Sequence, residues 1–398
     1  MEWTSAMSTL ANTADALSEC VSGVRAGTKS GLDPNLIVVF SSPDHDAPTL
    51  SLGADIRRHF PGATVVGCSG AGVIGDGLEV EDAPGLSLTA AVLPGVTLCA
   101  FHLPGSSVPS PDAPPDAWAA AVGVTADVGP HFILLADPFS TDIDALLSGM
   151  DFAFPAAAKI GGLASGGNRP GAHALYLDDQ VLREGAVGVA LSGNVVVDTV
   201  VAQGCRPVGE AMHITSAERN LVLAVDDEPA LDALQRLFER MSPSDQALAQ
   251  RSLFLGIAMD PLQEQAGAGD FLIRNVVGID PRSKAVAVGA YLQEGQLVQF
   301  HVRDADTSAD DLRAALAGYR SDAGDRSAAG ALLFQCTGRG QYLYGRTGHD
   351  ADMFGEMIGS LPLGGFFCNG EIGPVGGTTY LHSYTSSFGI FRPRTAID

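Results

Sequence analysis

The sequence predicts an α/β protein with mixed β-sheets flanked by helices, organised as two domains. Three observations support this fold class: a strand–helix–strand–glycine unit that recurs, hairpin-like pairs of apolar runs after each unit, and a length of 398 residues. A chain of this length exceeds one ordinary hydrophobic core. The hairpins exclude a purely parallel sheet, because only antiparallel strands can be joined by a tight turn.

The recurring unit is found three times. The first copy runs from the apolar strand Leu36–Phe40 through a helical segment to "TVVGCSGAG" at Thr64. The second copy begins with "HFILLADPF" at His131, and the third with "ALLFQCTGRG" at Ala331. A proline should stop the helix of each copy shortly before its glycines. These prolines are Pro61, Pro155 and Pro362.

We expect an N-terminal helical segment over residues 1–34, a first domain over residues 35–221 and a second domain over residues 222–398. The break should lie between Val208 and Asp227, after the hairpin of the second copy. In the second domain, Glu228–Met241 has one apolar stripe and predicts a helix.

Weaker signals predict three further features. Ser216 offers a helix cap, and "SADDLRAAL" begins a helix with Ser308 as its cap. The segment "SLFLGIAMDP", from residue 252 to 261, with the apolar runs after it, suggests a fourth copy of the recurring unit.

The composition limits which binding partners and which cell compartment we expect for the chain. The net charge is −23, from 46 acidic and 23 basic residues, and a field of that sign repels nucleic acid and anionic membranes. The N-terminus lacks the features of a signal peptide, and no apolar run is long enough to span a membrane. We therefore expect a soluble, cytoplasmic protein with no nucleic-acid or membrane partner.

The six cysteines are scattered, without a CxxC pair, and the nine histidines include no HExxH motif. Metal sites need closely spaced ligands, and disulfide frameworks belong to short secreted chains. We expect reduced thiols, no metal and no cofactor.

The first glycine segment has some features of a nucleotide site and some of a catalytic site. "GAGVIG" at Gly70 has dinucleotide-fingerprint spacing, but it leads into a strand-like segment, and no lysine completes a Walker A motif. Cys68 would need a base beside it to act as a nucleophile, and a small buried thiol is the commoner role. The amides of Ser69 and Gly70 can instead bind an anion such as a carboxylate.

In the third copy, Cys336, Thr337 and Arg339 lie in a glycine-flanked turn at a strand end, where α/β sheets usually bind ligands. Arg339 can hold a carboxylate through two parallel hydrogen bonds. The alternative is a surface arginine beside a capping threonine.

The following segment, "GFFCNGEIGPVGG", brings Cys368, Asn369 and Glu371 together among glycines. Glu371 can receive an ammonium group, so that with Arg339 the site would suit a zwitterion. The alternative is that Asn369 adopts a left-handed turn and Glu371 faces water. For Arg303 and Asp304, which are adjacent at another strand end, a structural ion pair is the favoured interpretation.

Several of these motifs together resemble the FIST family, the F-box and intracellular signal transduction proteins. "VVGCSGAG" and "IGG" resemble its N-terminal domain, while "FLIRNVVGID", "LLFQCTGRG" and "LGGFFCNGEIGPVGG" resemble its C-terminal domain in order and spacing. The resemblance implies a sensory protein. Bacterial members are proposed to bind small ligands such as amino acids, and eukaryotic members carry an F-box and act as ubiquitin-ligase adaptors.

The favoured hypothesis is a non-enzymatic signal-transduction module that binds an amino acid or similar small carboxylate and acts on an unidentified signalling protein. Its binding residues would be Cys68, Ser69, Gly70, Cys336, Thr337, Arg339, Cys368, Asn369 and Glu371. One alternative is an interaction scaffold related to the F-box adaptors; only about 35 residues precede the first predicted strand, too few for an F-box. The other alternative is a cysteine-dependent hydrolase or transferase.

Overall fold

The computed structural model describes residues 1–45, 51–260, 266–267, 269–324 and 326–395, and it confirms a mixed α/β fold. The chain divides into two compact units. The first unit comprises Met1–Val201, Arg313–Leu381 and Thr385–Asp398, and the second comprises Ala202–Leu312 and His382–Tyr384. The domain boundaries at residues 34/35 and 221/222 stay a prediction.

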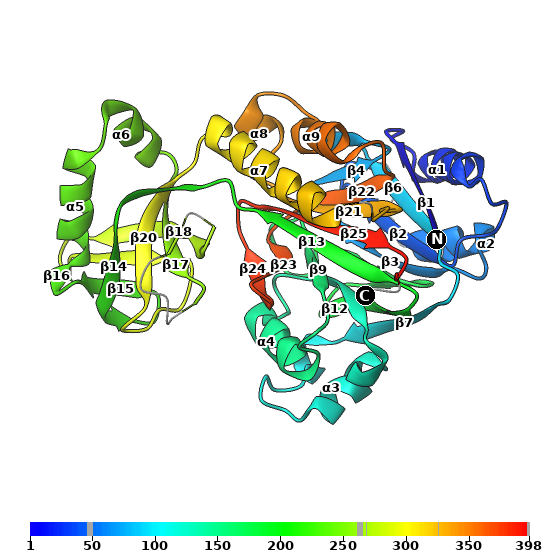
Figure 1. Ribbon diagram of the computed structural model, residues 1–398, viewed down its shortest axis with the longest axis horizontal. Helices are drawn as coiled ribbons and strands as arrows, with labels where there is room; N and C mark the ends of the chain where they lie inside the picture. The colour runs from blue at the N-terminus through cyan, green and yellow to red at the C-terminus, as the bar shows by residue number, and fades with distance from the viewer. Residues whose placement is uncertain (46–50, 261–265, 268, 325, 396–398) are drawn as a thin grey trace. The chain divides into compact units, whose positions relative to one another are not determined.

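The first unit contains three six-stranded sheets (Figure 1), each described below in the order in which neighbouring strands pair. The first sheet is β1 (Glu2–Ser8), β6 (Leu86–Val92), β2 (Leu36–Ser41), β3 (Thr64–Ser69), β10 (Leu175–Leu177) and β11 (Gln180–Leu182). The second is β24 (Thr378–His382), β23 (Glu371–Val375), β9 (Lys159–Leu163), β8 (His131–Ala136), β12 (Ala186–Gly193) and β7 (Val96–Leu103). The third is β13 (Val196–Ala202), β25 (Ser386–Arg392), β21 (Gly330–Cys336), β22 (Leu363–Cys368), β4 (Gly72–Gly75) and β5 (Leu78–Glu81).

The three sheets share one plan, which confirms the three repeats. Each has a central parallel pair: β2 with β3, β8 with β9, and β21 with β22. A strand of the same repeat lies antiparallel on one side: β6, β12 or β25. The other side takes a hairpin from a different repeat, because β10 pairs with β3, β23 with β9 and β4 with β22. The hairpins are thus exchanged in a ring among the three sheets.

Helices connect the parallel strands of each repeat and precede the predicted prolines. α2 (Leu52–His59) lies between β2 and β3, α4 (Ile143–Ala153) between β8 and β9, and α8 (Gln341–Tyr344) and α9 (His349–Ile358) between β21 and β22. The remaining α-helices are α1 (Thr13–Gly27), α3 (Pro115–Val122), α5 (Ala230–Arg240), α6 (Pro243–Ala249) and α7 (Ala305–Ala323), with 3-10 turns at Gly105–Ser107 and Ala126–Val128. The segment 1–34 therefore contains the strand β1 as well as the helix α1.

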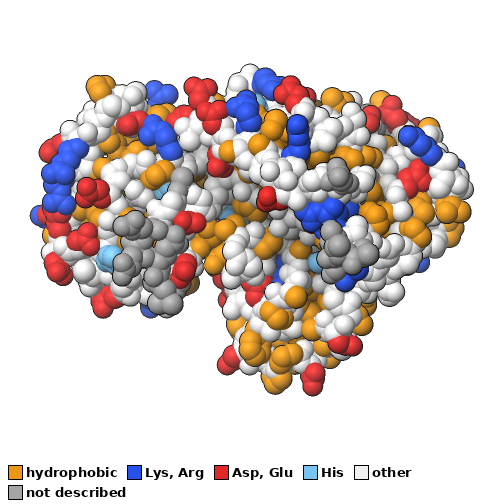
Figure 2. Space-filling view, viewed as in Figure 1, with side chains coloured by type: hydrophobic (Ala, Val, Ile, Leu, Met, Phe, Trp, Pro, Cys, Tyr) orange, Lys and Arg blue, Asp and Glu red, His pale blue; other side chains and the backbone are white. Residues whose placement is uncertain are grey.

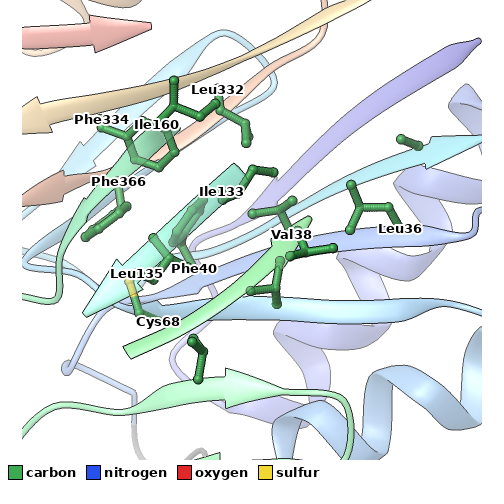
Figure 3. Packing of buried hydrophobic residues seen from close by; sticks show 14 of the residues in the cluster. Leu36, Val38, Phe40, Cys68, Ile133, Leu135, Ile160, Leu332, Phe334 and Phe366 are labelled. Carbon is green, nitrogen blue, oxygen red and sulfur yellow. The ribbon is translucent and has the colours of Figure 1, made fainter. Parts of the chain in front are cut away.

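One hydrophobic core is shared by the three sheets of the first unit. Phe40 from β2, Ile133 from β8 and Phe366 from β22 belong to the same cluster of buried side chains. Figure 3 shows members of this cluster from all three sheets, with the Cys68 side chain among them. Separate clusters pack α1 and α2 on the outer face of the first sheet, and α3 and α4 on that of the second.

A glycine stands at the closest approach of each parallel pair. A Cβ atom at Gly67, Gly161 or Gly365 would lie 1.7 to 1.9 Å from a backbone carbonyl oxygen of the neighbouring strand. Contacts that short do not occur between real atoms, so a side chain would push the two strands apart. The glycines that appeared as loop residues in the sequence are therefore mostly strand residues, required by packing.

The second unit is a closed antiparallel barrel. Its strands follow the order β14 (Arg206–Glu218), β20 (Leu297–Val302), β17 (Leu253–Ala258), β18 (Phe271–Asp280), β19 (Ala285–Val288) and β15 (Leu221–Val225), with β16 (Glu228–Pro229) attached. Pairing of β14 with β15 closes the ring. The predicted fourth copy of the recurring unit is wrong, because β17 pairs antiparallel with β18 and β20 instead of forming a parallel pair.

The helix predictions are partly confirmed. The helix expected over Glu228–Met241 is α5, but the cap expected at Ser216 lies inside the strand β14. α7 begins at Ala305, and the carboxylate of Asp304 accepts the N–H of Thr307 at 2.8 Å, so Ser308 is not its cap. On the face seen in Figure 2, basic side chains lie in separate groups among acidic and apolar ones.

We expect Gly365→Ala to lower the free energy of unfolding of the first unit by more than about 3 kcal/mol. The backbone of Gly365 has φ +156°, and the added methyl group would meet the carbonyl oxygen of Leu333. Both tryptophans, Trp3 and Trp118, are buried in the first unit. Tryptophan fluorescence during urea unfolding therefore reports on this unit.

Gly355→Ala is the matched control, because Gly355 lies in α9 with no atom near the added methyl group. Alanine is the better helix former, so this variant should be neutral or up to about 1 kcal/mol more stable. Equal stabilities of the two variants would show that close strand packing does not require Gly365.

Candidate functional site

The loops predicted to bind a ligand meet at one end of the parallel pairs. Ser165, which follows β9, links two of them: its hydroxyl accepts the N–H of Ala71 at 2.7 Å and donates to the carbonyl of Phe367. The side chain of Asn369 donates to the carbonyl of Ala164 at 3.0 Å. All three repeats therefore contribute to this region. Ser165 was missed in the sequence, although it stands in the glycine segment of the second copy.

A cavity of about 490 Å³ opens beside these loops, and we call it the Thr337 pocket. It is lined by Ala71, Gly72, Glu81, Asp82, Thr337, Gln341, Tyr342 and Phe367. Thr337, Asp82 and Tyr342 are exposed, so the pocket is open to solvent. Of the nine predicted ligand-binding residues, only Thr337 lines it. Whether any of the nine binds a ligand stays a prediction.

Arg339 lies beneath the pocket loop and is fully buried. Its Nε and Nη2 donate to the two carboxylate oxygens of Asp350 at 2.7 and 3.3 Å, and Nη2 also donates to the hydroxyl of Tyr344 at 2.6 Å. Burial alone would lower the pKa of Arg339, but the charge of Asp350 raises it above its usual value. Arg339 thus binds a carboxylate through two hydrogen bonds, as predicted from its side chain. That carboxylate is Asp350 of the protein and not a ligand.

Asp350 collects several hydrogen-bond donors besides Arg339. The hydroxyl of Ser386 donates to Oδ2, and Nδ1 of His349 lies 2.7 Å from Oδ1. Burial alone would raise the pKa of Asp350, but the charge of Arg339 and these hydrogen bonds bring it below its usual value. Asp350 also stands in the first turn of α9, where the helix dipole favours negative charge.

The hairpin of the first repeat carries two glutamates to this region. Glu79 accepts the backbone N–H groups of Gly348, Asp350 and Ala351 at 3.2, 3.1 and 2.8 Å, and so caps α9. Burial, followed by the charge of Asp350, raises the pKa of Glu79 to about 8. Glu81 accepts the N–H of Gln341 at 2.9 Å, and burial raises its pKa. No local signal marks these residues, because their partners lie about 260 positions away in the sequence.

Glu371 is a fully buried carboxyl group and does not face water. Its Oε2 accepts the hydroxyl of Thr385 at 2.7 Å and the N–H of Thr385 at 3.1 Å. Burial raises the pKa of Glu371 to about 8, and the hydrogen bonds of Thr385 oppose that rise only in part. Asn369 is exposed and does not have the positive φ of a left-handed turn, so that alternative is wrong.

The cysteines of the three loops are buried thiols. Cys68 and Cys368 are fully buried, and burial raises the pKa of both well above its usual value. Cys336 is 7% exposed and accepts the N–H of Gly338 at 3.4 Å. Nucleophilic chemistry needs an accessible thiolate. The surroundings of Cys68 therefore disfavour the catalytic alternative.

Among the described residues, no group of three or more His, Cys, Asp or Glu side chains is arranged to hold a metal ion. Within the same residues, no helix combines the length and apolar character needed to cross a membrane. Asp304 pairs with Arg206 at 3.3 Å, so the predicted Arg303–Asp304 ion pair is wrong.

Comparisons with known proteins agree with the motifs. Residues 35–228 match the FIST N domain, and residues 230–374 match the FIST C domain. An uncharacterised protein of Mycobacterium tuberculosis strain H37Rv is 35% identical over 371 residues, covering 91% of this chain and 92% of the relative. An uncharacterised protein of Mycobacterium bovis is 34% identical over 364 residues, with the same coverage.

Two more distant proteins were also found. An F-box/LRR-repeat protein of Arabidopsis thaliana is 23% identical over 265 residues, covering 58% of this chain and 49% of that protein. The crystal structure of a cyanuric acid hydrolase from A. caulinodans aligns over 99% of both chains, with a TM-score of 0.36 and 10% identity.

We expect the free energy of unfolding of the first unit to fall as the pH rises from about 5 to 8. In that range the unfolded state has already lost the Glu371 proton, whose pKa is ordinarily about 4.5, while the folded state keeps it up to about pH 8. One such group contributes a slope of up to about 1.4 kcal/mol per pH unit. Glu371→Gln should retain the hydrogen bonds of Thr385 and make the pH dependence shallower.

Urea unfolding, followed by tryptophan fluorescence at several pH values, measures this slope. Glu356→Gln is the control, since Glu356 is an exposed glutamate of α9. It should follow the wild-type curve. If Glu371→Gln also runs parallel to the wild type, the carboxyl group of Glu371 does not retain its proton in the folded protein.

Proposed function

The chain belongs to the FIST family, whose domains are sensory and signal-transduction modules, and we propose that it senses a small molecule bound in the Thr337 pocket. The ligand we propose is an amino acid or a similar small carboxylate that also carries an amino group. We further propose that binding changes the affinity of the chain for a signalling protein.

The observation that carries this proposal is the lining of the pocket. Glu81 and Asp82 place two carboxylates at a cavity of about 490 Å³, which is the size range of small-molecule sites. Glu81 is half-buried, and its pKa is raised by burial, so a cation that reaches it compensates part of the cost of desolvation. An ammonium group supplies that charge together with hydrogen-bond donors.

Neutral donors on the same wall suit the other end of the ligand. Thr337, Gln341 and Tyr342 offer a hydroxyl, an amide and a phenol to the pocket. For Arg339 to bind the ligand carboxylate directly, its guanidinium would have to leave Asp350 buried and unpaired, which costs several kcal/mol. We therefore propose that Arg339 holds the pocket loop in place and that Thr337 and Gln341 contact the carboxylate.

The loop offers a route for a signal. It joins the strand β21 to the helices α8 and α9. The carboxylate of Glu81, from the first repeat, accepts the backbone N–H of Gln341 at the end of this loop. A ligand between Glu81 and Thr337 would favour one arrangement of the loop and of the exposed surface beside it. A cytoplasmic location is part of the proposal; it is supported by the six cysteines, which are all free thiols.

We expect that calorimetric titration of the wild-type chain against the common amino acids will identify a ligand, and that Glu81→Gln will bind it at least tenfold more weakly. Loss of a charge-assisted hydrogen bond of about 1.4 kcal/mol or more accounts for a factor of ten. Thr337→Val, which keeps the volume but removes the hydroxyl, should also weaken binding.

Asp33→Asn is the control, because Asp33 is an exposed acidic residue outside the pocket. It should bind like the wild type. If Glu81→Gln binds the same ligand with unchanged affinity, the ammonium contact is misassigned. If amino acids, amines and small carboxylates all fail to bind at millimolar concentration, the scaffold alternative gains and a search for protein partners is the next step.

A further inference from the structure

The second unit contains a buried cation, Arg303, which follows strand β20. Only 5% of its surface is exposed, and its guanidinium lies over the ring of Tyr384, 4.5 Å from the ring centroid. Its Nε and Nη1 are buried and have no hydrogen-bond partner among the described residues. Arginine stays protonated in proteins, so this position carries a positive charge.

Two acidic side chains that follow Arg303 in the sequence are bonded elsewhere. Asp304 accepts the Nε–H of Arg206 at 3.3 Å and the N–H of Thr307 at 2.8 Å. Asp311 accepts the N–H of Gly204 at 3.0 Å. Burying a charge without a counter-ion costs several kcal/mol of desolvation free energy. A cation–π contact with one aromatic ring offsets only about 1 to 2 kcal/mol of that cost. Among the described residues no carboxylate is bonded to Arg303, so the balance favours an additional anion.

Two buried acceptors without partners are found in the same unit. Oε1 of Gln203 and Nε2 of His301 make no hydrogen bond among the described residues. Arg206 stands opposite Val302 in the β14–β20 pair, so Gln203 and Arg303 lie at the same end of these strands. His301 stands in β20, two residues before Arg303, and so lies near the same end of the strand.

His301 is neutral and can accept a hydrogen bond at this end of the barrel. Its Nδ1 lies 2.9 Å from the carbonyl oxygen of Gln299, and burial lowers the pKa of His301 to about 4. The neutral ring therefore donates through Nδ1 and leaves Nε2 as an acceptor. Phe271 packs against this ring, with centroids 5.1 Å apart, and Phe254 packs against Tyr384 at 4.5 Å. Aromatic rings thus lie beside the cation, Arg303, and beside one of the two acceptors, His301.

We propose that this end of the barrel binds a small hydroxy- or amino-carboxylate. The side-on edge of the Arg303 guanidinium, Nε–H together with Nη2–H, donates to the two oxygens of the ligand carboxylate. A hydroxyl or amino group of the ligand donates to Gln203 or His301. All of these residues belong to the second unit. The site is therefore separate from the Thr337 pocket and does not depend on the function proposed for that pocket.

The test is calorimetric titration of the full chain with sodium lactate and sodium acetate, at an ionic strength fixed with sodium chloride. Lactate should bind, acetate should bind more weakly because it lacks the hydroxyl donor, and Arg303→Met should weaken lactate binding at least tenfold. Arg303→Gln, which keeps a polar group, provides a second variant without the charge. Arg240→Met removes an exposed arginine of α5 and should bind lactate like the wild type.

Thermal unfolding without any carboxylate separates this role from a structural one. Arg303→Met removes an uncompensated charge, so the proposal expects the variant to unfold at the same temperature as the wild type or a higher one. The proposal is overturned if the variant unfolds at a lower temperature and still binds lactate like the wild type. It is also overturned if chloride competes with lactate on equal terms, or if lactate does not bind to the wild type.

Discussion

Each parallel strand pair of the first unit takes one of its two neighbours from another repeat, and most of the structure follows from that exchange. The hairpin β4–β5 completes the third sheet, β10–β11 completes the first and β23–β24 completes the second. No repeat can therefore satisfy the backbone hydrogen bonds of its own sheet. The three sheets also bury their inner faces in one common core, so the repeats stabilise one another through both hydrogen bonds and packing.

The candidate site is a direct consequence of the exchange. The hairpin that completes the third sheet carries Glu79 to the first turn of α9 and Glu81 to the wall of the Thr337 pocket. There it meets the buried ion pair of Arg339 and Asp350. Such a pair contributes little net stability, but leaving either partner alone is costly, so it fixes the loop in one arrangement. A ligand in this pocket would contact two repeats at once.

The sequence predicts the repeats well because their signals are local: apolar strands, prolines that end helices, and glycines at close strand contacts. It does not predict which sheet receives each hairpin, since several short apolar hairpins fit the same edge. For that reason Glu79 and Glu81 were missed. The burial of Arg339 and Glu371 was not predicted either, because both were expected to contact a ligand or, as the alternative, water. The barrel was misread as a further repeat because its strands carry the same apolar pattern as the first unit.

The first unit should unfold as one cooperative body, and native-state hydrogen exchange measures this directly. Phe334 of β21 contacts Phe40 and Phe366 edge-on in the shared core, with ring centroids 6.5 and 6.0 Å apart. We expect Phe334→Leu to lower amide protection in β2–β3, β8–β9 and β21–β22 by the same free energy. Loss of protection confined to β21–β22 would contradict this expectation and show that the repeats unfold independently.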